Sequence, residues 1–132
     1  VFLVNPDGTN ARRLTAVGGM QSAESDPAWS PDGSRIALWR YVSGLSLAEQ
    51  GREPISLLTY DQVVVYGAKP AWSPDGATIL FNSLRRVGSG WSIWSIAPAG
   101  GTPRVVIEDG YDPAWSPDGK RIAFVRRARL TP

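Results

Sequence analysis

The heptapeptide PAWSPDG occupies residues 27–33, and the same seven letters return at residues 70–76 and 113–119. The tryptophans of successive copies, Trp29, Trp72 and Trp115, are separated by 43 positions both times. A constant spacing of this size is typical of repeat proteins, and it falls within the range of propeller blades that contain four strands each. The chain is therefore predicted to repeat one structural unit.

Each copy of the heptapeptide predicts a hairpin. A short apolar run follows it each time, at residues 36–39, 79–81 and 122–125. The connection contains Ser-Pro-Asp-Gly, in which proline presets φ, aspartate bonds back to the turn backbone and glycine adopts a positive φ. Two antiparallel strands, here called a and b, are therefore expected in every copy.

Two more β-rich runs, strands c and d, are predicted at residues 55–58 with 63–66 and at residues 93–96 with 105–107. The first residues of the chain match such a second half. The matched pairs are Val1 with Ile93, Val4 with Ile96, Pro6 with Pro98 and Gly8 with Gly100. We therefore expect one all-β propeller segment of four-stranded antiparallel blades, with strands c-d in residues 1–15, complete blades in 27–66 and 70–107, and strands a-b in 113–127.

The two complete blades are not identical in sequence. Under this assignment the segment YVSGLSLAEQGREP, residues 41–54, is the longest insertion between strands b and c. Insertions in repeat proteins often lie on the binding face. This segment is therefore predicted to be a contact loop.

The repeat resembles a known family. PAWSPDG followed by RIA and an aromatic residue, with a preceding strand ending in DGTNARRLT, resembles the TolB-type β-propeller repeat over essentially the whole chain. Relatives of this type are typically six-bladed, and similar propellers serve as non-catalytic gating domains in prolyl oligopeptidase-like enzymes and in the tricorn protease. The resemblance implies half of a six-bladed ring and a periplasmic or secreted location.

Three blades' worth of strands cannot close a ring, because propellers need at least about four blades. Free strand edges are expected at strand c, near Phe2 and Val4, and at strand b, near Phe124 and Val125. A homodimer in which strands a-b of each chain meet strands c-d of the other would give six blades with two-fold symmetry. The alternative is that the chain is a piece of a longer six-bladed protein.

Composition argues against several function classes. The net charge of +2, from 14 Lys and Arg against 12 Asp and Glu, is too small to indicate a nucleic acid partner. Adjacent arginines occur at residues 12–13, 85–86 and 126–127, on different blades. Neighbouring residues in a strand point to opposite faces, so these pairs are not expected to form one basic patch for nucleic acid. The absence of Cys and His removes disulfides, thiolate chemistry and the commonest metal ligand. No apolar run approaches the roughly 20 residues that span a membrane.

The connections from d to a and from b to c share one face of a propeller, and the varied sequence gathers there. Asp26, Lys69 and Asp112 occupy the same repeat position and are expected at the channel mouth, either as a cation or polar-ligand site or as a structural ring of hydrogen-bonded caps. The other candidate binding residues on this face are Arg40, Tyr41, Arg85, Trp91 and Arg126. Trp91, beside Gly90, is the candidate aromatic ligand contact.

No catalytic constellation is recognised, and neither a metal nor a cofactor is predicted. The aspartates at 32, 75 and 118 are interpreted as turn formers, and Trp29, Trp72 and Trp115 as wedges between blades. Nothing distinguishes any two of Glu108, Asp109 and Asp112 as a catalytic carboxylate pair from ordinary surface acids. We predict a non-enzymatic scaffold for protein interaction and self-assembly. The alternative is a carbohydrate- or peptide-binding propeller, possibly hydrolase-associated, with its site at the channel mouth.

Overall fold

The computed structural model describes residues 1–15, 23–41, 43–58, 69–84 and 90–126. The regular secondary structure in these ranges consists of β-strands. The strands are β1 (Phe2–Leu3), β2 (Arg12–Arg13), β3 (Glu24–Trp29), β4 (Arg35–Arg40), β5 (Gly44–Glu49), β6 (Ile55–Ser56), β7 (Ala71–Trp72), β8 (Ile79–Leu84), β9 (Trp91–Ile96), β10 (Arg104–Ile107), β11 (Tyr111–Trp115) and β12 (Ile122–Val125). Within the same ranges there is no helix that could cross a membrane.

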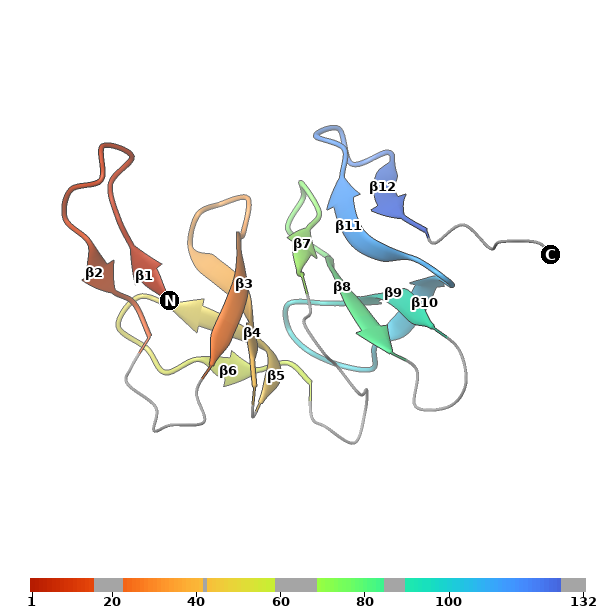
Figure 1. Ribbon diagram of the computed structural model, residues 1–132, viewed down its shortest axis with the longest axis horizontal. Helices are drawn as coiled ribbons and strands as arrows, with labels where there is room; N and C mark the ends of the chain where they lie inside the picture. Colours follow the sequence, from red (N-terminus) through yellow and green to blue (C-terminus); the bar gives the residue numbers. More distant parts are fainter. Residues whose placement is uncertain (16–22, 42, 59–68, 85–89, 127–132) are drawn as a thin grey trace.

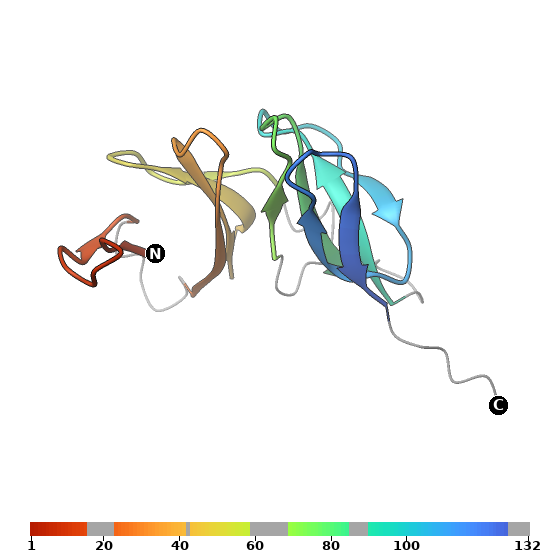
Figure 2. The ribbon, with the colours of Figure 1, turned by 90° about the horizontal axis from the view of Figure 1, so that it is seen from above.

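The strands form four antiparallel sheets that follow one another in chain order (Figures 1 and 2). Strands β3 to β6 and β7 to β10 make two complete four-stranded sheets, each in sequential order. At one end of the row lies the two-stranded sheet β1-β2, and at the other end lies β11-β12. The predicted all-β fold with half-blades at both ends is thereby confirmed.

The Pro-Asp-Gly turns have the predicted structural role. In the first copy, the Ser30 hydroxyl and the Ser34 N–H both donate to Oδ1 of Asp32, at 2.6 and 3.0 Å. Gly33 has a φ of 69°, which glycine adopts without a steric penalty. The bonds from serine to aspartate recur at Asp75 and Asp118, so all three aspartates are turn formers.

The second half of the first blade differs from the prediction. Strand c is β5, Gly44–Glu49, which lies inside the segment interpreted as an insertion, and Ile55–Ser56 forms strand d instead of strand c. Residues 44–49 are therefore part of the sheet and not an insertion between strands b and c. The predicted strand at residues 63–66 lies outside the described residues.

Burial explains why β5 is a strand. Its first five residues, from Gly44 to Ala48, are all buried, and the Ser46 hydroxyl donates to the Gly44 carbonyl at 3.2 Å. Gly, Ser and Ala have little intrinsic preference for strands. The neighbouring strands and the core beneath β5 therefore decide its conformation, and local sequence does not reveal it.

The main hydrophobic core lies between the two complete blades. It contains Trp39, Leu45 and Leu47 from the first blade and Trp72 and Phe81 from the second. Trp72 is only 8% exposed, and its indole Nε1 donates to the Ala28 carbonyl at 3.1 Å across the blade boundary. Trp72 is therefore a wedge between blades, as predicted.

The equivalent residue of the preceding repeat behaves differently. Trp29 is 55% exposed, so the expectation that it is a buried wedge is wrong for the single chain. The reason is its neighbour, because the sheet before Trp29 has only β1 and β2 and lacks a strand in the place of β3. Trp115 is intermediate: its ring is half-buried and its Nε1 has no acceptor among the described residues.

Candidate functional site

The three residues predicted to ring the channel mouth share an unusual backbone. Asp26, Lys69 and Asp112 have φ values of 54°, 35° and 54°. For residues other than glycine this left-handed conformation is strained. The pairing register of β3 shifts between Ser25 and Ala28, and that of β11 shifts at the equivalent place, between Tyr111 and Ala114. All three repeats therefore share the left-handed backbone at this position, and the first and third also share a β-bulge.

Lys69 and Asp112 form a bonded pair. Lys69 Nζ donates to Asp112 Oδ2 at 2.8 Å, and this hydrogen bond, with the charge of the carboxylate, raises the pKa of Lys69. The charge of Asp26 acts on Lys69 in the same direction. Lys69 therefore lies in the field of the aspartates that flank it along the row of blades.

The other side of Asp112 is tied to the preceding blade. The buried Asn82 of β8 donates from Nδ2 to Asp112 Oδ1 at 3.2 Å, and its Oδ1 accepts the Asp112 backbone N–H at 2.8 Å. Both carboxylate oxygens of Asp112 thus have partners within the protein. No group of three or more His, Cys, Asp or Glu that could hold a metal occurs in the part of the chain that the structure describes.

The other candidate binding residues make no contact with Lys69 or Asp112 that the structure shows. Arg40 lies against Glu24, and the exposed Tyr41 donates its backbone N–H to the Ala23 carbonyl at 3.0 Å. Trp91, which begins β9, is half-buried. The Arg126 guanidinium lies 5.2 Å from the Phe124 ring centroid. Arg85 lies outside the described residues.

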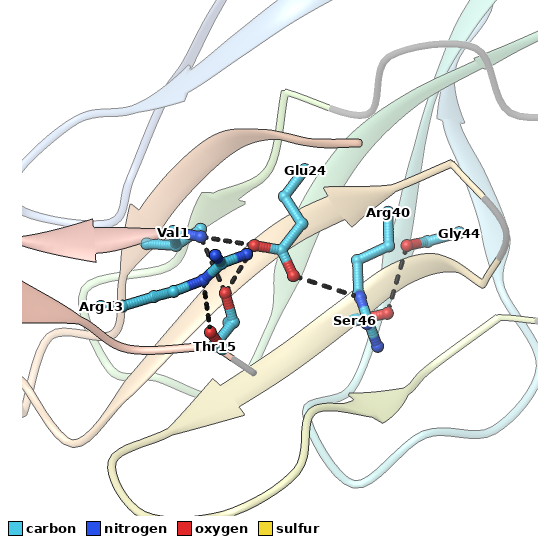
Figure 3. Close-up of polar contacts among 7 residues, drawn as sticks. All are labelled: Val1, Arg13, Thr15, Glu24, Arg40, Gly44 and Ser46. Carbon is cyan, nitrogen blue, oxygen red and sulfur yellow. Dashed lines mark hydrogen bonds and ion pairs between the residues drawn. The ribbon is translucent and has the colours of Figure 1, made fainter. Parts of the chain in front are cut away.

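A polar cluster that was not predicted joins β1-β2 to the first complete blade (Figure 3). Its centre is Glu24, whose side chain is almost completely buried and whose Oε2 accepts hydrogen bonds from the Val1 amino group and from the Thr15 hydroxyl. Arg40 Nε lies 3.4 Å from Glu24 Oε1, and Arg13 Nε donates to the Thr15 carbonyl at 2.9 Å.

The charge state of Glu24 follows from these partners. Burial raises its pKa, but the bonds from the Val1 amino group and Thr15, together with the charge of Arg40, outweigh burial and hold the pKa below its ordinary value. Glycine occupies the equivalent position of the next two repeats, Gly67 and Gly110. This departure from the repeat was the available sequence signal for the cluster.

The two half-blades leave apolar side chains exposed at both ends of the row. Phe124 on β12 is 38% exposed, whereas Phe81, at the same position of β8, is completely buried. Val125 beside it is exposed, as are Phe2 on β1 and the following Val4. Strands β12 and β1 also have one unpaired backbone edge each within the described sheets. These two edges form a candidate interaction surface.

Comparison with known proteins supports the fold. No protein-family model matches the chain, and no curated protein matches its sequence. Among solved structures, a protein described as TolB from Agrobacterium tumefaciens aligns with a TM-score of 0.69 and 25% identity over 89% of this chain and 42% of its own length. TolB from Acinetobacter baumannii aligns with a TM-score of 0.57 and 16% identity over 98% of this chain and 43% of its own length.

The chain thus spans less than half the length of the TolB structures that it matches. A third match, the isopeptidase AtxE2, has a TM-score of 0.46 and 19% identity, which is too distant to support an argument about activity. The two TolB structures, which cover most of this chain, agree with the all-β sheets described above. The chain has the TolB-type β-propeller fold.

Proposed function

We propose that this chain is a non-enzymatic β-propeller scaffold for protein interaction that assembles with a second copy of itself. In this proposal β12 of each copy pairs with β1 of the other, so that each half-blade is completed to four strands. Two composite blades and four intrachain blades then make a six-bladed ring. The observation that carries the proposal is the pair of unpaired, apolar edges at β1 and β12.

Burial at matched repeat positions supports this pairing. Ala123 and Phe124 are exposed in β12, whereas Leu80 and Phe81 are buried at the same positions of β8, and so are Ala37 and Leu38 in β4. The sequence of β12 thus retains apolar residues where the complete blades bury them. Burial of apolar surface of this kind drives most protein association.

The complete blade gives the expected register. Strand β8 pairs with β9 so that Leu80 lies opposite Ser95 and Phe81 lies opposite Trp94. Ala123 takes the place of Leu80, and the match between the first residues and β9 puts Leu3 in the place of Ser95. We therefore expect Ala123 opposite the partner's Leu3, and Phe124 opposite the partner's Phe2.

Light scattering coupled to size-exclusion chromatography tests the assembly. The unmodified chain is expected to elute at twice its own mass, and Phe124→Lys is expected to give the mass of one chain, because it places a charge in the paired edge. Ile55→Lys is the matched control, since Ile55 is an exposed apolar residue on β6, away from the proposed edge. A single-chain mass for the unmodified protein at high concentration would contradict the proposal.

Cysteine cross-linking tests the register, because the chain has no cysteine of its own. Directly opposed residues of antiparallel strands have Cα atoms about 4.5 to 5.5 Å apart, which a disulfide can bridge. The variant with Ala123→Cys and Leu3→Cys should form a disulfide-linked dimer on mild oxidation. Ala123→Cys combined with Phe2→Cys should cross-link poorly, since neighbouring residues in a strand point to opposite faces. Equal cross-linking of both variants would rule out the register.

A further inference from the structure

Identical heptapeptides give Trp29 and Trp72 very different surroundings. Trp29 is 55% exposed and Trp72 is 8% exposed, although the six residues around each are the same. An exposed indole at a position that is buried one repeat later indicates a contact surface whose other half is missing from the single chain. The contacts of Trp72 show what that other half consists of.

Trp72 contacts the first two strands, β3 and β4, of the blade before it. Its Nε1 donates to the Ala28 carbonyl at 3.1 Å, and the Arg35 guanidinium lies 5.3 Å from its ring centroid. The turns of successive blades also lie close together. A Cβ added to Gly76 would lie 3.9 Å from Pro31 Cδ, and one added to Gly119 would lie 3.7 Å from Pro74 Cδ.

The half-blade in front of Trp29 has no equivalents of β3 and β4, because it consists of β1 and β2 only. The repeat places the equivalents of Ala28 and Arg35 in the last half-blade, at Ala114 and Arg121. Both residues are exposed, and the Arg121 side chain makes no ion pair or hydrogen bond with any described residue. The chain therefore carries both halves of this contact at opposite ends.

We propose that Trp29 is a docking site for the last half-blade of a second copy of this chain, with its indole N–H donating to the carbonyl of the partner's Ala114 and its ring lying under the guanidinium of the partner's Arg121. This inference rests on the proposed assembly and adds a contact between blade faces to the pairing of strand edges. In the same arrangement Gly33 abuts the partner's Pro117.

Arg121 gives this contact its specificity. The repeat position of Arg35 and Arg121 is occupied by Thr78 in the middle copy. By its repeat position Thr78 faces Trp115, whose Nε1 has no acceptor among the described residues. Arg35 faces Trp72, whose Nε1 donates to Ala28. In these two boundaries the indole hydrogen bond thus accompanies the arginine. Arg121 in the last half-blade corresponds to Arg35, which lies over Trp72. The last half-blade is therefore suited to cover Trp29 in the same way.

A double-mutant cycle on the dimer dissociation constant tests the contact. Each dimer would contain two such contacts, so Arg121→Ala should weaken dimerisation roughly 5- to 30-fold, as expected for two cation–π contacts. In a Trp29→Leu background, which has no aromatic ring, the same substitution should have a clearly smaller effect. Arg35→Ala is the matched control, because it removes the equivalent intrachain contact and should lower the stability of the chain more than its tendency to dimerise.

A spectroscopic measurement separates failure of this inference from failure of the proposed assembly. In protein labelled with 5-fluorotryptophan, the resonance that Trp29→Phe removes should lose its sensitivity to exchange of H2O for D2O when the chain dimerises. A dimeric mass with a solvent-exposed Trp29 and no effect of Arg121→Ala would overturn the docking site and leave edge pairing intact. A single-chain mass would overturn both.

Discussion

The indole of Trp72 and the carbonyl of Ala28 are joined by a 3.1 Å hydrogen bond across the boundary between two blades. This bond lies in the main core, so Trp72→Ala should lower the free energy of unfolding by about 3 to 5 kcal/mol through loss of packing. Trp29→Ala should change the free energy of unfolding by only about 0.5 kcal/mol, as for an ordinary surface residue. Denaturant unfolding at concentrations where the chain is monomeric measures both variants. Equal losses would contradict the observed difference in burial.

Asn82 should matter more to stability than Lys69, although both bind Asp112. Asn82→Ala leaves the Asp112 backbone N–H without its acceptor next to the core, which should cost about 1 to 3 kcal/mol. Lys69→Ala removes an ion pair that is exposed to solvent, so its loss of stability should be the smaller of the two. Urea unfolding of both variants at low and high salt provides the comparison. A larger loss for Lys69→Ala would indicate that the ion pair dominates.

Gly44 should tolerate alanine less well than Gly51. Both glycines have positive φ, 71° and 77°, so alanine is strained at either position. At Gly44 the added Cβ would also lie 3.3 Å from the Trp39 ring and 3.4 Å from the Leu58 carbonyl, whereas nothing lies within 4 Å at Gly51. Thermal unfolding of Gly44→Ala and Gly51→Ala should therefore show the larger decrease in Tm for Gly44→Ala. Equal decreases would mean that the core adjusts to the methyl group.

The turn aspartates should make stability depend on pH in the acid range. The hydrogen bond from Ser30, followed by those from Ser34, lowers the pKa of Asp32 from 3.8 to about 2. A carboxyl whose pKa is depressed by folding stabilises the fold fully above the unfolded pKa, and this contribution is lost as pH falls through the folded pKa. Between pH 4 and pH 2, Asp32→Asn should therefore lose less stability than the unmodified chain.

The serine bonds are the cause of this shift, and they can be removed separately. In Ser30→Ala the largest contribution to the depressed pKa of Asp32 is absent, so the carboxyl should titrate at higher pH. A ¹³C NMR titration of the Asp32 carboxyl measures this directly. An unchanged titration midpoint in Ser30→Ala would show that other groups hold the pKa down.

Local turn chemistry made the hairpins and the order of the sheets predictable. Pro, Asp and Gly of the heptapeptide act through their own backbone and through the serine beside them, so sequence alone locates the turns. Strand β5 was missed because Gly44, Ser46 and Ala48 become strand residues through burial. The exposure of Trp29 was missed for a related reason, since identical local sequence has different neighbours at the two ends of a repeat array.

The candidate site was less accessible from sequence than the fold. Lys69 and Asp112 occupy equal repeat positions and are hydrogen-bonded, because blades that follow one another bring equivalent residues to the same edge. The Glu24 cluster depends on a residue that breaks the repeat, and its partners Val1, Thr15 and Arg40 come from three separate segments. No periodic pattern contains that information.

The bonds between Asn82 and Asp112 also bear on how quickly two copies could associate. They hold β11 against the preceding blade within the single chain, so in the proposed dimer β11 and β12 would meet the partner as an ordered unit. Ordering of loose segments on binding lowers affinity, and preorganisation avoids that cost. Loosening this anchor should therefore slow association and weaken the dimer even though Asn82 lies outside the proposed interface.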